Sequence, residues 1–270
     1  MALPLPPGLT HAEVAFLAEM ELVTVVPRQR LDSIDLLGGK TPPLRPPQRA
    51  DLPLWLALLL KKQRRANIVP PPWLHPSSLA DIILRETKEH PDAFSDPPPA
   101  PARADPSRPG RAYGQGTGAG EGGEPGVVLS PPFRAASCTA DAPAGFLPYH
   151  WLEVAEALLA HAADDVAGLG GGGDNGAAEV RSLLRDLVEV RAAKLRNSTS
   201  QLEGFGGGLM SLRGVGAMEL AESRGFVLGV VDGVRKIGAS TEAARREEEE
   251  EGGRMGGVGE EGESDEEMGI

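Results

Sequence analysis

The sequence has few aromatic residues, a single cysteine and no long apolar run. Aromatic residues make up 4% of the 270 residues, so a packed core must be small and consist mainly of Leu, Val and Ala. One thiol, Cys138, cannot form an internal disulfide, which is typical of a reducing compartment. The longest apolar run, residues 52–60, is shorter than the about 20 residues that span a bilayer. Because the N-terminus also lacks a leader-like pattern, we expect a soluble nuclear or cytosolic protein without a membrane partner.

Positive charge is also scarce. Lys and Arg number 27 against 39 Asp and Glu, which gives a net charge of −12. Residues 241–270 alone contain 12 acidic and 3 basic residues, so the first 240 residues carry a net charge of only −3. This distribution does not favour attraction of the whole surface to DNA, and it predicts an acidic, disordered tail over 241–270.

The sequence shows no recognisable arrangement of catalytic residues. None of the five histidines stands at metal-ligand spacing from another histidine or from the cysteine. Residues 168–173 formally match a dinucleotide fingerprint, but a helix with adjacent carboxylates precedes them where the motif requires a strand. We therefore expect no enzyme, no metal and no cofactor. An enzyme built on this glycine loop stays as an alternative of a different class.

The N-terminal fifty residues predict a small β-rich domain. Thr10 and Glu13 form a capping-box pattern, which predicts a short helix over 11–19. A β-branched run then predicts a strand over 22–27, and a second extended run covers 31–37.

The rest of the chain is mainly helical. Apolar spacing predicts helices that start near residue 54 and that cover 79–90, 152–166, 180–195 and 209–237. Residues 96–145 are rich in Pro, Gly, Ala and Ser and include Cys138, which predicts a disordered insertion. The expected class is α+β, mainly α, with a β-rich domain 1–50, helices 51–95, the insertion 96–145, further helices 146–240 and the tail 241–270.

Several residues are candidates for contacts with a partner. Trp55 and Trp73 either anchor the core or fill a pocket on another protein. Leu59 belongs to a helix that is apolar on every side, and such a helix must be covered all round, which favours an obligate oligomer.

Two basic clusters at helix ends complete the candidate set. The cluster Lys61, Lys62, Arg64 and Arg65 fits a solvated helix end, a contact with an acidic face or DNA phosphate, or a nuclear localisation signal. Arg191, Lys194 and Arg196 fit a helix terminus that matches the dipole, or a bridge across an interface. Ser264, which acidic residues follow, resembles a site for an acidophilic kinase.

A family resemblance follows from specific blocks of residues. The chain reads AEVAFLAE and then ELVTVVP over 12–27, and it resembles the opening of the GINS complex subunit 2 family, the second Psf proteins. Further blocks match in the family's order at 37–39, 52–57, 71–74, 148–164 and 179–196. The insertion, the loop 168–176, the glycines at 204–208 and the tail depart from the family pattern.

The resemblance implies a small β-rich N-terminal domain and a larger helical domain. It also implies a non-catalytic subunit of a nuclear heterotetramer with the Sld-five protein and the first and third Psf proteins. That tetramer would join the MCM ring and its Cdc-family activator as a scaffold of the replicative helicase, and it would meet DNA indirectly. The alternative from the residues is a DNA-binding adaptor that uses the cluster from Lys61 to Arg65.

Overall fold

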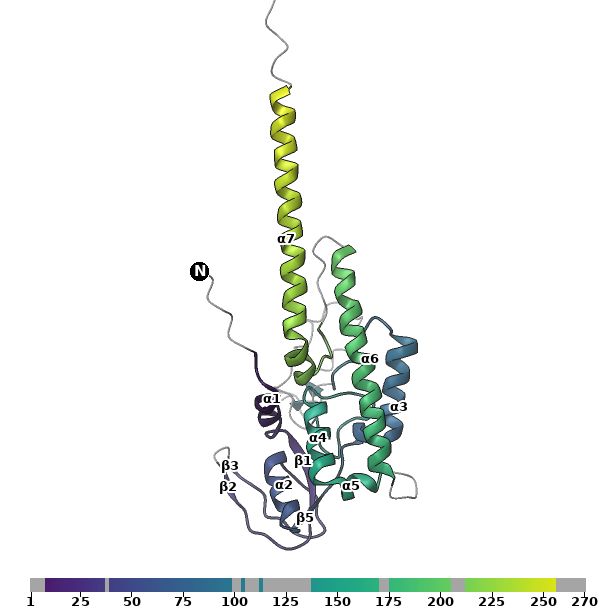
Figure 1. Ribbon diagram of the computed structural model, residues 1–270. Helices are drawn as coiled ribbons and strands as arrows, with labels where there is room; N and C mark the ends of the chain where they lie inside the picture. The colour runs from purple at the N-terminus through teal and green to yellow at the C-terminus, as the bar shows by residue number, and fades with distance from the viewer. Residues whose placement is uncertain are drawn as a thin grey trace, which may run out of the picture. The chain divides into compact units, whose positions relative to one another are not determined.

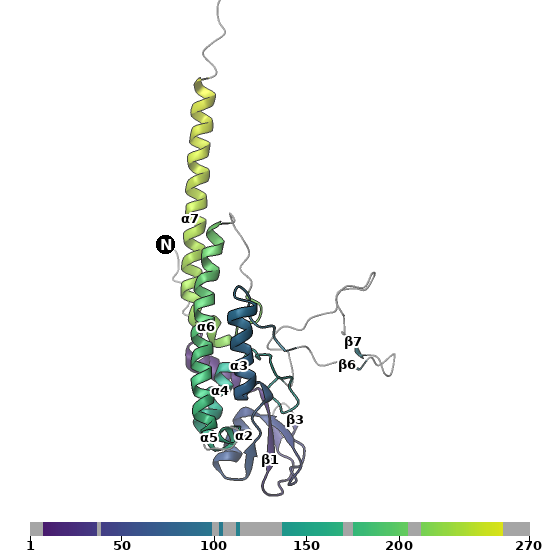
Figure 2. The ribbon, with the colours of Figure 1, turned by 90° about the vertical axis from the view of Figure 1, so that its right-hand side faces the viewer.

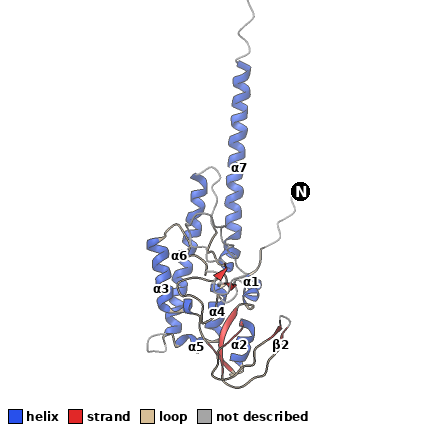
Figure 3. Ribbon diagram, turned by 180° about the vertical axis from the view of Figure 1, so that it is seen from behind, coloured by secondary structure: helices blue, strands red, loops and turns tan. Residues whose placement is uncertain are grey.

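The computed structural model describes residues 8–36, 39–98, 103–104, 112–113, 137–169, 175–204 and 212–255. The chain divides into two compact units, which are considered separately. The first comprises 1–198 with 211–224, and the second comprises 199–210 with 225–270. Helices dominate both units, and the short strands lie in the first (Figure 3). The predicted α+β, mainly α class is confirmed.

A three-stranded antiparallel sheet forms around β1 (Leu22–Pro27), which lies between β4 (Ala50–Pro53) and β5 (Ala66–Ile68). Helix α1 (His11–Ala18) precedes β1, and its predicted capping box is present, with the Thr10 amide donating to Glu13 Oε2 at 2.7 Å. Two short antiparallel pairs are also present: β2 (Asp35–Leu36) with β3 (Gly39–Lys40) (Figure 1), and β6 (Arg103–Ala104) with β7 (Ala112–Tyr113) (Figure 2).

The sheet continues past the domain boundary expected after residue 50. Strand β4 crosses this boundary and strand β5 begins after it, so the β-rich part of the chain reaches Ile68. The sequence did not reveal these strands because each has only three or four residues and their partner is distant in sequence. The division of the chain into domains stays a prediction.

The helices of the first unit surround one core. They are α2 (Leu54–Lys62), the 3₁₀ turn η1 (Pro72–Leu74), α3 (Pro76–Leu84), the π-helical turn η2 (Arg85–Glu89), α4 (Trp151–His161), α5 (Ala163–Ala167) and α6 (Gly176–Gly204). Residues 199–204 at the end of α6 belong to the second unit. Figure 1 shows α2 beside the sheet, with α4 and the first unit's part of α6 rising from that end. Buried apolar residues of the sheet and of these helices form a continuous cluster.

The prediction of disorder is wrong for residues 137–145. Cys138 is 0% exposed and forms a parallel bridge with Val23, and the Ala140 amide donates to the Thr24 hydroxyl at 2.9 Å. Small residues such as Ala, Ser and Cys carry no periodic signal, although they fit closely against an existing strand. Residues 99–102, 105–111 and 114–136 of the predicted insertion lie outside the described residues.

Helix α7 (Ala217–Met255) begins in the first unit and continues in the second. It extends through 241–255, where a disordered tail was expected; Glu, Ala and Arg are favourable helix residues, which accounts for the difference. Residues 256–270, including Ser264, lie outside the described residues. None of the described helices is both long and apolar enough to cross a membrane.

A basic pocket and a buried ion-pair network

Helix α2 ends in a complete Schellman motif that places basic side chains on a tight loop. The Arg64 amide donates to the Lys61 carbonyl at 2.8 Å, and the Arg65 amide donates to the Leu60 carbonyl at 2.9 Å. Arg64 adopts φ 58°, the left-handed conformation that usually belongs to glycine at this position. The loop therefore holds an arginine where glycine would be less strained.

Lys61 anchors α5 to α2. Its Nζ lies 2.7 Å from Asp164 Oδ2 and 2.8 Å from Asp165 Oδ2, and its side chain is only 9% exposed. Asp165 also accepts a hydrogen bond from the Ile68 amide of β5 at 2.8 Å. The hydrogen bond from Lys61 lowers the pKa of Asp164. Lys61 therefore makes a tertiary contact within the chain, and the carboxylates of α5 compensate its charge.

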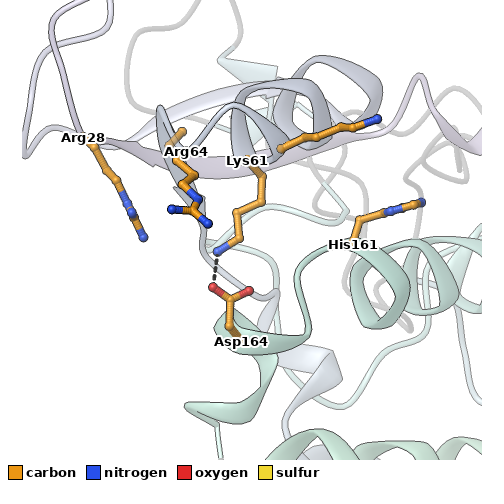
Figure 4. A pocket seen from close by; sticks show the side chains of 7 residues that line it. Arg28, Lys61, Arg64, His161 and Asp164 are labelled. Carbon is orange, nitrogen blue, oxygen red and sulfur yellow. Dashed lines mark hydrogen bonds and ion pairs between the residues drawn. The ribbon is translucent and has the colours of Figure 1, made fainter.

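The neighbouring basic residues line a pocket of about 380 Å³. The pocket lies between the α2 loop, the end of β1 and the junction of α4 with α5 (Figure 4). Its lining consists of Arg28, Lys61, Lys62, Arg64, Ala66, His161 and Asp164. Arg28 Nε donates to Asn67 Oδ1 of β5 at 2.9 Å, which orients its guanidinium group. Arg65 is exposed but is not part of this lining.

Sequence reasoning found Lys61, Lys62 and Arg64 but missed Arg28, His161 and Asp164. Arg28 follows a strand with only Arg30 as a basic neighbour, and Asp164 lies 103 residues beyond Lys61. No local pattern brings these residues together, because the pocket depends on the pairing of β1 with β5 and on the packing of α5.

The apolar candidates on and after α2 separate into core and surface. Trp73 is fully buried in the core cluster, which supports its interpretation as a core anchor. Trp55 is half-buried and packs against that cluster, and Leu59 is exposed. Trp55 and Leu59 thus remain candidates for a partner contact.

The second basic cluster forms a buried ion-pair network within the chain. Arg191 Nη1 lies 2.5 Å from Glu86 Oε1, and Arg191 Nε lies 2.6 Å from Glu219 Oε1. Arg191 Nη2 also donates to Glu219 Oε2 at 2.9 Å and to the Gly214 carbonyl at 2.7 Å. The guanidinium carbon lies 4.9 Å from the centre of the Phe94 ring. This arrangement joins η2, α6 and the start of α7.

Lys194 extends the same network. Its Nζ donates to the carbonyls of His90 at 2.8 Å and Ala93 at 2.6 Å, and it lies 3.4 Å from Glu86 Oε2. Helix packing buries the side chains of Arg191 and Lys194 within the chain, which disfavours a direct contact of either residue with a partner. Arg196, one turn beyond Arg191, is exposed.

Electrostatics explain how such charges are tolerated in the interior. Burial favours the neutral form of Arg191, but the ion pairs with Glu219 and Glu86 outweigh it and raise its pKa above the ordinary value. Burial lowers the pKa of Lys194, and the attraction of Glu86 only partly offsets this effect. The network is a structural element and not a proton-transfer site, since arginine does not lose its proton in proteins.

The loop near residue 168 does not have the context of a nucleotide site. The short helix α5 precedes Gly168, whereas a dinucleotide fingerprint requires a strand there. Residues 170–174 of this loop lie outside the described residues.

Comparisons with known proteins agree on one family. Residues 10–69 match the model of the PSF2 N-terminal domain, and residues 134–238 match the model of the GINS complex protein helical bundle domain. The DNA replication complex GINS protein psf2 of Neurospora crassa is 67% identical over 100% of both chains. The protein of the same name from Aspergillus fumigatus is 50% identical over 99% of both chains. That from Schizosaccharomyces pombe is 29% identical over 88% of this chain and 96% of its own.

Proposed function

Because the chain belongs to the PSF2 family of GINS complex proteins, we propose that it is a non-catalytic scaffold subunit of a DNA replication complex. Its partners in this proposal are the Sld-five protein and the first and third Psf proteins. The assembled tetramer would hold the MCM ring and its Cdc-family activator in the geometry of the working helicase, in the nucleus. The observation that carries this proposal is the 67% identity over the whole length to a GINS protein.

The surface of the first unit is consistent with a subunit that packs against other proteins. Phe16 and Met20, in and just after α1, are each 69% exposed, and Leu59 of α2 is also exposed. The Trp55 amide at the start of α2 donates to the Glu19 carbonyl at 3.2 Å, so the segments that carry these residues adjoin. We take these exposed apolar side chains as candidates for contact with a partner subunit.

Co-expression with the three partner proteins, followed by mass determination, tests the proposal. We expect a particle with one copy of each subunit, and we expect the chain expressed alone to aggregate. A stable monomer that does not bind the three proteins would contradict it. A variant with Phe16→Ser and Met20→Ser should weaken assembly, whereas Leu9→Ser, an exposed apolar residue before the Thr10 cap, serves as a matched control.

A further inference from the structure

We propose that the pocket bounded by Arg28, Lys62 and Arg64 binds an acidic peptide segment of a protein partner. The inference rests on the proposed function only in taking this partner to be another protein of the replication assembly. Three features of the pocket carry it: uncompensated positive charge, a strained residue that presents one of the charges, and a size that suits side chains.

Three of the four basic residues that line the pocket have no carboxylate partner within the described part of the chain. Lys61 has two carboxylate partners, but Arg28, Lys62 and Arg64 form no ion pair there. The whole chain carries a net charge of −12, so a cluster of cations that lack carboxylate partners within the described residues is a local exception. Placing like charges together costs free energy, and binding of an anionic group would remove this cost.

The backbone conformation of Arg64 supports a role for its side chain outside the fold. A residue other than glycine is strained in the left-handed region, and glycine would complete the same Schellman motif without this strain. Figure 4 shows the side chains of Arg64, Arg28 and Lys61 extending to the same side of the ribbon. The strained backbone of Arg64 therefore coincides with a guanidinium group that lines the pocket, as expected for a residue with a binding role.

The size and charge of the pocket favour an acidic peptide over DNA. A volume of about 380 Å³ lies in the range of sites that enclose a small ligand or a few side chains. Two arginines can each bind a carboxylate through paired hydrogen bonds. Strong binding of DNA usually needs on the order of six to ten phosphate contacts along a track, and the net charge of −12 opposes the approach of a polyanion.

A peptide titration on the assembled complex tests this proposal. The probe is a fluorescein-labelled peptide of Glu residues, the neutral control is the same peptide of Gln, and binding is followed by fluorescence anisotropy at low salt. We expect the Glu peptide to bind and the Gln peptide not to bind. Arg64→Gly should raise Kd about three- to tenfold, while the melting temperature stays equal or rises because the strain is relieved.

Matched variants separate the pocket from general electrostatics. Arg45→Ala removes one exposed charge outside the pocket and should leave Kd unchanged, whereas Arg28→Ala should weaken binding as Arg64→Gly does. Absence of binding by the Glu peptide, or equal loss in the Arg45 variant, would overturn the proposal. Tighter binding of a single-stranded oligonucleotide that depends on the same two arginines would assign the pocket to DNA instead. Failure of the proposed function appears earlier and separately, as failure of the four proteins to assemble.

Discussion

Arg191 of α6 and Glu219 in the first turn of α7 form a two-point ion pair, with Nε–Oε1 and Nη2–Oε2 separations of 2.6 and 2.9 Å. The same guanidinium group reaches Glu86 of η2, so one side chain fixes three segments that are far apart in sequence. Glu219 Oε2 also accepts the Gly216 amide at 2.7 Å, which ties the chain just before α7 into the same network. The start of α7 is thus held by charge-assisted hydrogen bonds in a buried setting.

Arg191→Met should be strongly destabilising. It would leave Glu86 and Glu219 buried without their principal partner, and loss of one member of a buried ion pair costs about 3–5 kcal/mol. Hydrogen exchange of the assembled complex, read by mass spectrometry, should show faster exchange in 85–95 and 214–224. Arg185→Met on the exposed face of α6 is the matched control. Protection equal to that of the native chain in the Arg191 variant would refute a stabilising role for the network.

Gly214→Ala should also destabilise the start of α7. Gly214 has φ +82°, and an added Cβ would lie 2.2 Å from the Ser95 carbonyl oxygen. Strain and overpacking together predict a loss of about 2–4 kcal/mol. The melting temperature of the complex provides the measurement. Gly168→Ala, where the nearest atom is at 3.5 Å and φ is −65°, should be neutral or slightly stabilising.

Cys138 should be protected from thiol reagents in the native protein. It is fully buried, and burial raises the pKa of its thiol well above the ordinary value, so little thiolate is present and access is blocked. Because it is the only cysteine of the chain, mass determination of the alkylated subunit reports on it directly, even within a complex. We expect labelling only after denaturation. Rapid labelling under native conditions would contradict the packing of 137–145 against β1.

Glu21→Gln should change how stability depends on pH. Burial raises the pKa of Glu21 above 4.5, the attraction of His150 and the Ser137 hydrogen bond only partly oppose this, and Glu153 adds to it. A raised carboxyl pKa gives stability that is fully present below the unfolded pKa and is lost as pH rises through the folded pKa. The variant should therefore melt above the native protein at pH 7, and this difference should shrink towards pH 4.5. A constant difference across this range would exclude titration of Glu21 as its cause.

Local patterns in the sequence were sufficient for the elements with strong internal signals. Thr10 and Glu13 specify the start of α1, the β-branched run specifies β1, and regular apolar spacing specifies α4 and α6. Strands β4 and β5 and the segment around Cys138 could not be predicted, because each depends on pairing with the distant β1. Their residues show neither alternation nor helical spacing over a sufficient length.

The candidate site was predicted only in part for a similar reason. The basic run after α2 indicated charge, but nothing local distinguished Lys61, which α5 compensates, from Lys62 and Arg64, which line the pocket. Likewise, a position near the end of an amphipathic pattern did not reveal that Arg191 is buried. Its partners Glu86 and Glu219 lie 105 and 28 residues away, so only the packed chain shows that it is an internal ion pair.

The continuous core of the first unit bears on how this chain can be divided. Homology separates two segments, 10–69 and 134–238, which suggests two inherited modules. Yet Val23 and Ile68 of the sheet belong to the same buried cluster as Trp151 and Leu187 of the helices. Cutting the chain between the modules would expose apolar faces on both fragments. The two segments that homology separates should therefore unfold together as one cooperative unit. A fragment that contains only one of them should aggregate rather than fold by itself.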